Sequence, residues 1–63
     1  MKELKDICFQ SRTKAGLSQE QFAKIIGSTQ TEISFTERGF IPASEEKVQR
    51  IINFAKQIED KEG

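Results

Sequence analysis

The side chains best suited to chemistry in this sequence are amides and hydroxyls at the starts of two stretches of helical character. Gln19 follows Ser18 at the first of these points, and Gln30 and Thr31 follow Thr29 at the second. An amide offers a donor and an acceptor side by side, and a hydroxyl can act as either, so both recognise polar groups by hydrogen bonding. Such side chains are typical of a binding surface rather than of a reaction centre.

Catalysis and metal binding find little support in the composition. The 63 residues include no histidine and a single cysteine, Cys8, so neither a metal cluster nor a nucleophile with an imidazole base can be assembled. We expect no enzyme, catalytic residue, metal, cofactor or small-molecule ligand. No apolar run approaches the ~18 residues of a membrane span, and Met1 leads directly into charged residues, so we expect a cytoplasmic protein without membrane contact.

The formal charges balance, with ten Lys and Arg against ten Asp and Glu. Proteins that bind nucleic acid usually carry a surplus of basic residues, because neutralising phosphate supplies much of their affinity. Composition alone therefore argues against such a partner. The balance differs along the chain: residues 1–27 carry five basic and three acidic side chains, whereas residues 28–63 carry five basic and seven acidic ones.

Apolar periodicity, caps and glycines predict four helices. Ser18 with Gln21, and Thr29 with Glu32, have the spacing of a capping box at the second and third helix starts. The expected helical ranges are 2–15, 19–26, 29–38 and 44–58. A polar tail that should fray follows them. The whole chain, 1–63, is thus predicted to be one all-α domain. Its expected core consists of Cys8, Phe22, Ile26, Ile33, Val48, Ile51 and Ala55.

Two short helices joined by a turn at Gly27 are the components of a helix-turn-helix. Residues 19–38 resemble the helix-turn-helix of the Cro/CI repressor family, also called the XRE family. Ala23 stands where the two helices touch, Gly27 stands in the turn, and Ile33 faces inward. The likeness covers about residues 4–55, and it implies a small lambda-repressor-like domain in which the outer helices support the helix-turn-helix.

The resemblance also implies roles for individual side chains. An ion pair between Arg12 and Glu37 is expected to hold the first helix on the third. The third helix would enter the major groove of DNA, where the Gln30 amide suits an adenine edge. Candidate DNA-reading residues are Thr29, Gln30, Thr31, Ser34 and Phe35, and candidate phosphate contacts are Gln19, Lys14, Lys24 and Arg38.

Two adjacent positions depart from the family pattern. Phe35 stands where relatives usually have a polar or basic residue, and Thr36 stands where they usually have an apolar core residue. Either the helix is slightly rotated, so that Phe35 points inward and Thr36 outward, or Phe35 is exposed as an anchor for a protein partner. Contact between Phe35 and a thymine methyl is a further alternative.

The acidic balance of residues 28–63 is a second departure. Glu32 and Glu37 lie on the predicted reading helix, where they would repel the DNA backbone. The sequence therefore favours a regulator of a phage-type genetic switch that masks the basic surface of a CI-type repressor, similar to the phage modulator-of-repression proteins. The alternative is an autonomous Cro-like repressor that reads double-stranded operator DNA in a bacterial host cell. Candidate partner-interface residues are Phe35, Glu32, Ile25, Phe40 and Ile41.

Overall fold

The computed structural model describes residues 3–42 and 44–62, with side chains as far as Glu59. Within those ranges the chain forms four helices and no strand, which confirms the predicted all-α fold. The helices are α1 (Leu4–Lys14), α2 (Gln19–Ile26), α3 (Gln30–Glu37) and α4 (Glu45–Glu62). The expected start of the first helix at residue 2 lies outside the described residues.

The last helix is longer than predicted. The polar tail was expected to fray after residue 58, but α4 continues to Glu62. Neither glycine nor proline occurs between Glu45 and Glu62, and Glu, Lys and Gln are good helix formers, so nothing in this segment ends the helix earlier. None of the helices in the described part of the chain combines the length and the apolar character that crossing a membrane requires.

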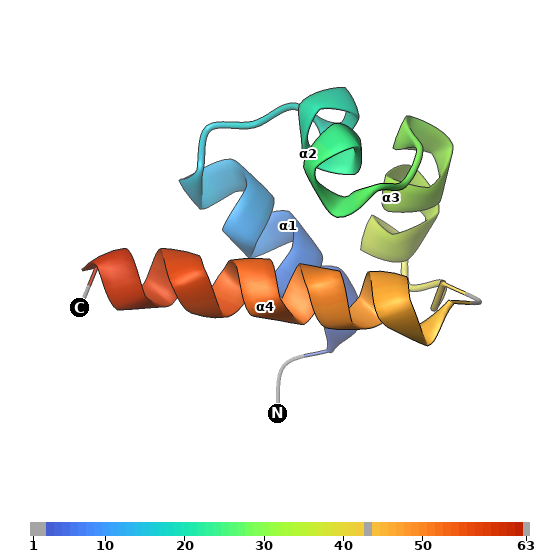
Figure 1. Cartoon of the computed structure of the whole chain (residues 1–63). Helices are drawn as coiled ribbons and strands as arrows, with labels where there is room; N and C mark the ends of the chain where they lie inside the picture. The colour runs from blue at the N-terminus through green and yellow to red at the C-terminus, as the bar shows by residue number, and fades with distance from the viewer. Residues whose placement is uncertain (1–2, 43, 63) are drawn as a thin grey trace.

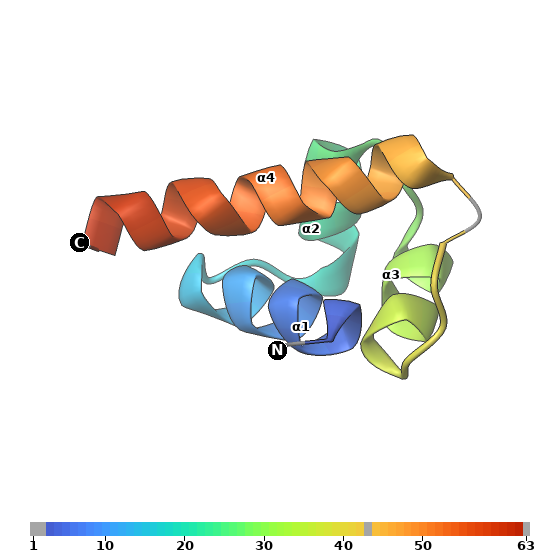
Figure 2. The same ribbon diagram turned by 90° about the horizontal axis from the view of Figure 1, so that it is seen from below.

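The four helices form two pairs, which Figure 1 shows from one side. α4 packs mainly against α1, and α2 packs mainly against α3. α1 also contacts α3 and so connects the two pairs. In Figures 1 and 2, α3 lies at the N-terminal end of α4, while the C-terminal end of α1 lies on the opposite side of the domain. One flank of α3 is therefore left uncovered.

The cap of α2 confirms the predicted capping box. The Ser18 hydroxyl accepts from the Gln21 backbone N–H at 3.1 Å, and the Gln21 side chain accepts from the Ser18 N–H at 2.9 Å. The cap of α3 has only one of the two hydrogen bonds of a capping box. Thr29 accepts from the Glu32 N–H at 3.2 Å, but Glu32 turns its carboxylate to Ser28 and Lys47 instead. The second predicted box was wrong because a cation on α4 attracts the carboxylate that would have completed it.

The turn between α2 and α3 is held from outside by α4. Gly27 has a φ of 81°, a left-handed conformation that glycine adopts without a Cβ clash. A Cβ at this position would lie 2.5 Å from Nη1 of Arg50, which donates to the Ile26 carbonyl at 3.0 Å. The Arg50 side chain thus occupies the space next to the glycine and caps the end of α2.

The core lies where α1, α2, α3 and α4 meet. Phe22 and Phe54 contact edge to face, with ring centroids 5.1 Å apart. Val48 and Ala55, both expected in the core, are only half-buried, and Ile51 is the one described side chain of α4 that is fully covered. The buried apolar residues are Cys8, Phe22, Ala23, Ile26, Ile33 and Ile51.

The structure decides between the two orientations of α3. Thr36 is 2% exposed and Phe35 is 46% exposed, so the rotated helix with Phe35 inward was wrong. Thr36 fills the position where the family usually has an apolar residue. Its hydroxyl donates to the Glu32 carbonyl one turn earlier at 2.9 Å, and this bond removes the cost of burying it.

Replacing Thr36 with valine is expected to leave stability within about 1 kcal/mol of the parent or to raise it. Valine has nearly the same shape, and the Glu32 carbonyl keeps its helical N–H donor, so no buried group loses its only partner. Urea unfolding followed by circular dichroism measures the change. A loss of about 2 kcal/mol or more would mean that the hydroxyl makes a contact beyond its own helix.

Candidate nucleic-acid interface

The structure brings Arg12 of α1 and Glu37 of α3 together in a two-point ion pair. Arg12 Nε donates to Glu37 Oε2 at 2.7 Å, and Nη2 donates to Oε1 at 3.1 Å. The side chains are 14% and 8% exposed. Nη1 of Arg12 also donates to the Leu17 carbonyl at 2.9 Å, so the guanidinium joins α1, the following loop and α3. The hydrogen bond to Glu37 raises the pKa of Arg12, which stays charged.

The same carboxylate is linked to the start of α3. Gln19 Nε2 donates to Glu37 Oε1 at 3.2 Å, and Gln30 Nε2 donates to Gln19 Oε1 at 3.4 Å. We call these three residues, Glu37, Gln19 and Gln30, the amide chain. It runs from a buried charge to an exposed amide at the first residue of α3.

Cys8 completes the surroundings of Glu37. Its thiol is 0% exposed and donates to Glu37 Oε2 across 3.7 Å. Burial raises the pKa of Cys8 to about 12, with a further contribution from the negative charge of Glu37. The thiol is therefore protonated at neutral pH and acts as a core residue.

Alkylation of Cys8 is expected to be at least ~100-fold slower in the native protein than in the urea-unfolded protein at pH 8. The folded site excludes the reagent and suppresses the thiolate, so reaction requires opening of the domain. The time course of iodoacetamide labelling by mass spectrometry measures this ratio. Labelling at the unfolded rate would place the thiol at the surface.

The predicted reading residues form an accessible surface along α3. Thr29, Gln30, Thr31 and Phe35 are exposed, and Ser34 is half-buried. Thr31 and Phe35 are four residues apart and so lie on one face of the helix. Thr29 is the N-cap, and its hydroxyl is engaged by the Glu32 N–H.

The two acids of α3, which were expected to repel the DNA backbone, are both paired with cations. Glu37 is paired with Arg12, and Lys47 Nζ of α4 donates to Glu32 Oε1 at 2.6 Å. Ser28 donates to the same oxygen at 3.0 Å. The hydrogen bonds from Lys47 and then Ser28 lower the pKa of Glu32, so they favour the folded state above pH ~4.3 and are lost as Glu32 is protonated at lower pH. Repulsion of phosphate by this helix is correspondingly smaller than expected.

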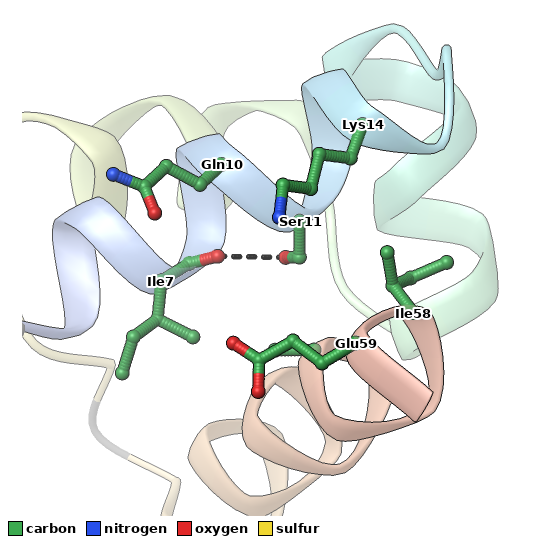
Figure 3. Close-up of a pocket in the computed structure, with 7 residues that line it drawn as sticks. Ile7, Gln10, Ser11, Lys14, Ile58 and Glu59 are labelled. Atoms are coloured by element: carbon green, nitrogen blue, oxygen red, sulfur yellow. Dashed lines mark hydrogen bonds between the residues drawn. The ribbon is translucent and has the colours of Figure 1, made fainter. Parts of the chain in front are cut away.

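The predicted phosphate contacts occupy different places. Gln19 lies beside Gln30, and Lys24 and Arg38 are exposed on α2 and at the end of α3. Lys14 instead lines a small hollow between α1 and α4 with Glu59 (Figure 3), at the end of α1 that is far from α3. Its assignment as a phosphate contact stays a prediction, made for a side chain at the end of α1 that lies away from α3.

No cluster of His, Cys, Asp or Glu suitable for a metal ion occurs among the described residues.

Residues 10–56, most of the chain, match the family described as Helix-turn-helix, HTH_3. The chain belongs to this helix-turn-helix family. Comparison with curated proteins and with solved structures gave no match. Members of the family are DNA-binding regulatory domains of the Cro/CI type and not typically enzymes, so DNA binding and transcription regulation are the function that membership indicates.

This helix-turn-helix domain has an apolar surface at the end of α3. Phe35 and Phe40 contact edge to face with centroids 5.8 Å apart, and Arg38 lies 5.9 Å from the Phe35 ring centre. Phe40 is 65% and Ile41 is 77% exposed. Phe35, Phe40, Ile41 and Pro42 line an open hollow at the end of α3. We call these four residues the apolar corner. Ile25 is also exposed but borders a separate hollow between α2 and α4.

Two residues that support the helix-turn-helix were missed from the sequence. Lys47 neutralises Glu32, and Arg50 caps α2 at Ile26 while pairing with Glu46 at 2.6 Å. Lys47 and Arg50 are nearly one helical turn apart on α4, so a basic pair facing two helix ends was the available signal. Its meaning depended on the helix packing, which the sequence did not provide.

Proposed function

We propose that this domain regulates transcription by placing α3 in the major groove of operator DNA. Gln30 and Thr31 would contact base edges, while Gln19, Lys24 and Arg38 would contact the phosphate backbone. The observation that carries the proposal is the amide chain, because it holds a polar side chain in a fixed orientation at the exposed start of α3. Pre-ordering of this kind lowers the entropy cost of recognition.

The pairing of both α3 acids supports the same proposal. A neutral chain can bind DNA when its acids are engaged internally and its exposed cations face the backbone. Glu32 and Glu37 are bound by Lys47 and Arg12, whereas Arg38 lies at the end of α3 beside the reading residues. The modest number of such cations predicts binding with a shallow salt dependence, about one unit of slope per phosphate contacted.

A direct experiment is to select binding sites from a random duplex DNA pool and then titrate the selected duplex at two salt concentrations. Gln30→Ala is expected to lose about 1–3 kcal/mol of discrimination at one base pair and little affinity for unselected DNA. Glu20→Ala, an exposed change in the first turn of α2, serves as the control. Failure to enrich any sequence would contradict operator reading.

The apolar corner supports a second candidate function, the masking of a CI-type repressor. Exposed aromatic side chains beside a hollow are typical anchors of protein interfaces. Phe35, Phe40 and Ile41 provide them on the same helix and loop that would face DNA, so one surface would serve either partner. The absence of an acidic face on α3 makes apolar contact, not charge, the basis of this alternative.

The two candidate functions predict opposite results for which of two variants, Phe35→Ala or Gln30→Ala, impairs function more. If masking of a CI-type repressor is the function, adding the protein should remove such a repressor from its operator, and Phe35→Ala should weaken this effect more than Gln30→Ala does. If operator reading is the function, Gln30→Ala should be the more harmful change and the repressor should be unaffected. An electrophoretic mobility assay with the repressor, its operator and each variant measures both.

A further inference from the structure

We infer that Glu37 is a positioning residue that determines the base accepted by Gln30, because it fixes the orientation of two side-chain amides in series. The inference rests on the proposed reading of bases by Gln30. Glu37 itself lies at the last residue of α3 and is nearly covered, so it would touch no base. Its effect would pass through Gln19.

The carboxylate of Glu37 sets the direction of the first hydrogen bond. An ionised carboxylate only accepts hydrogen bonds, whereas an amide presents an NH₂ on one side and an oxygen on the other. Gln19 must therefore turn its Nε2 toward Glu37 Oε1, across 3.2 Å. Its Oε1 then faces Gln30, so Gln30 must turn its own Nε2 toward Gln19, across 3.4 Å. One charge thus sets the polarity of both amides.

The carboxylate is prevented from turning away. Its two oxygens accept both Arg12 donors, the Gln19 amide and the Cys8 thiol. The Arg12 guanidinium is itself held by the Leu17 carbonyl at 2.9 Å. The start of the amide chain is therefore more rigid than its exposed end.

The polarity of Gln30 has a consequence for base recognition. With one N–H given to Gln19, the amide presents its oxygen and its second N–H outward, which matches the N6 donor and N7 acceptor of adenine. A reversed amide would place NH₂ opposite position 6 of the purine, where guanine has an acceptor and adenine has a donor. Guanine has a second acceptor at N7, which would then face the amide oxygen. Loss of the fixed polarity should therefore weaken the preference for adenine without creating a good match to guanine.

The test compares four variants on the selected duplex and on a duplex with adenine replaced by guanine at the position that depends on Gln30. Gln19→Met breaks the amide chain, and Glu37→Gln replaces the acceptor-only group that sets its polarity. Each is expected to lower the adenine-to-guanine ratio of affinities by roughly tenfold. Arg12→Lys weakens the fold but keeps the carboxylate, so the ratio should persist. Gln30→Ala should abolish it. Circular dichroism is used to choose a temperature at which every variant is folded.

Nuclear magnetic resonance provides a readout without DNA. The side-chain NH₂ signals of Gln19 and Gln30 are expected to differ from those of free glutamine in the parent protein, and the Gln30 signals should move to free values in Gln19→Met. Gln19→Met is the variant that keeps the Arg12–Glu37 pair. An unchanged ratio and unchanged Gln30 signals in this variant would overturn the inference. If Gln30→Ala leaves selected-site affinity intact, base reading by Gln30 fails, and the inference fails with it.

Discussion

Arg12→Ala is expected to destabilise the domain by about 3–5 kcal/mol, because it leaves the Glu37 carboxylate 8% exposed without its cation. A chain of 63 residues has a total stability of only about 3–9 kcal/mol, so much of the variant should be unfolded at 37 °C. Urea unfolding monitored by circular dichroism measures the loss. Glu37→Ala should have an effect of similar size, since it strands the guanidinium.

The matched control replaces both charges. Arg12→Met combined with Glu37→Leu removes the pair without leaving either charge buried, and such apolar replacements are often neutral. The double variant should therefore be clearly more stable than either single alanine variant, although it loses the start of the amide chain. Single losses below about 1 kcal/mol would show that solvent reaches the pair more freely than its geometry indicates.

Phe22→Ala is the second change with a large expected effect. The ring is 0% exposed and contacts Phe54 edge to face, so its removal leaves a cavity at the centre of the domain. Phe-to-Ala changes in cores cost about 3–5 kcal/mol, which approaches the whole stability of a domain this small. Thermal and urea unfolding are the measurements.

Phe35→Ala is the matched control for this prediction, since the chemistry of the substitution is the same and only the location differs. Phe35 is 46% exposed and loses mainly its contact with Phe40, so the expected cost is about 1 kcal/mol or less. Equal losses from the two variants would return Phe35 to the core and restore the rotated orientation of α3.

The local signals in the sequence predicted the secondary structure well. Caps and glycines depend on neighbours within a few residues, so the Ser18 box and the left-handed Gly27 followed directly from the sequence. The orientation of α3 could not be predicted in the same way. Thr36 can be buried only because its hydroxyl has a carbonyl available one turn earlier, and residue type alone gives no such information.

The candidate site was predictable only where the family resemblance supplied a long-range pair. Arg12 and Glu37 are far apart in sequence and were placed together by that likeness. The partner of Glu32 was not predicted, because Lys47 reaches it from a helix that the helix-turn-helix motif does not include. The surroundings of Lys14 were not predicted for a related reason: the sequence suggests that a side chain is exposed, but it does not give the side of the domain on which a helix ends.

The two contacts from α4 to the helix-turn-helix constrain how the domain would meet a duplex. Arg50 is bound to the last turn of α2, and Lys47 is bound to the first turn of α3, so the short connection between these helices is bridged on both sides. Changing the angle between α2 and α3 would require the hydrogen bonds of both side chains to break. The helices should therefore dock as a rigid body, and the cost of any induced fit should fall on the bending and twisting of the DNA, making flexible base steps part of the preferred site.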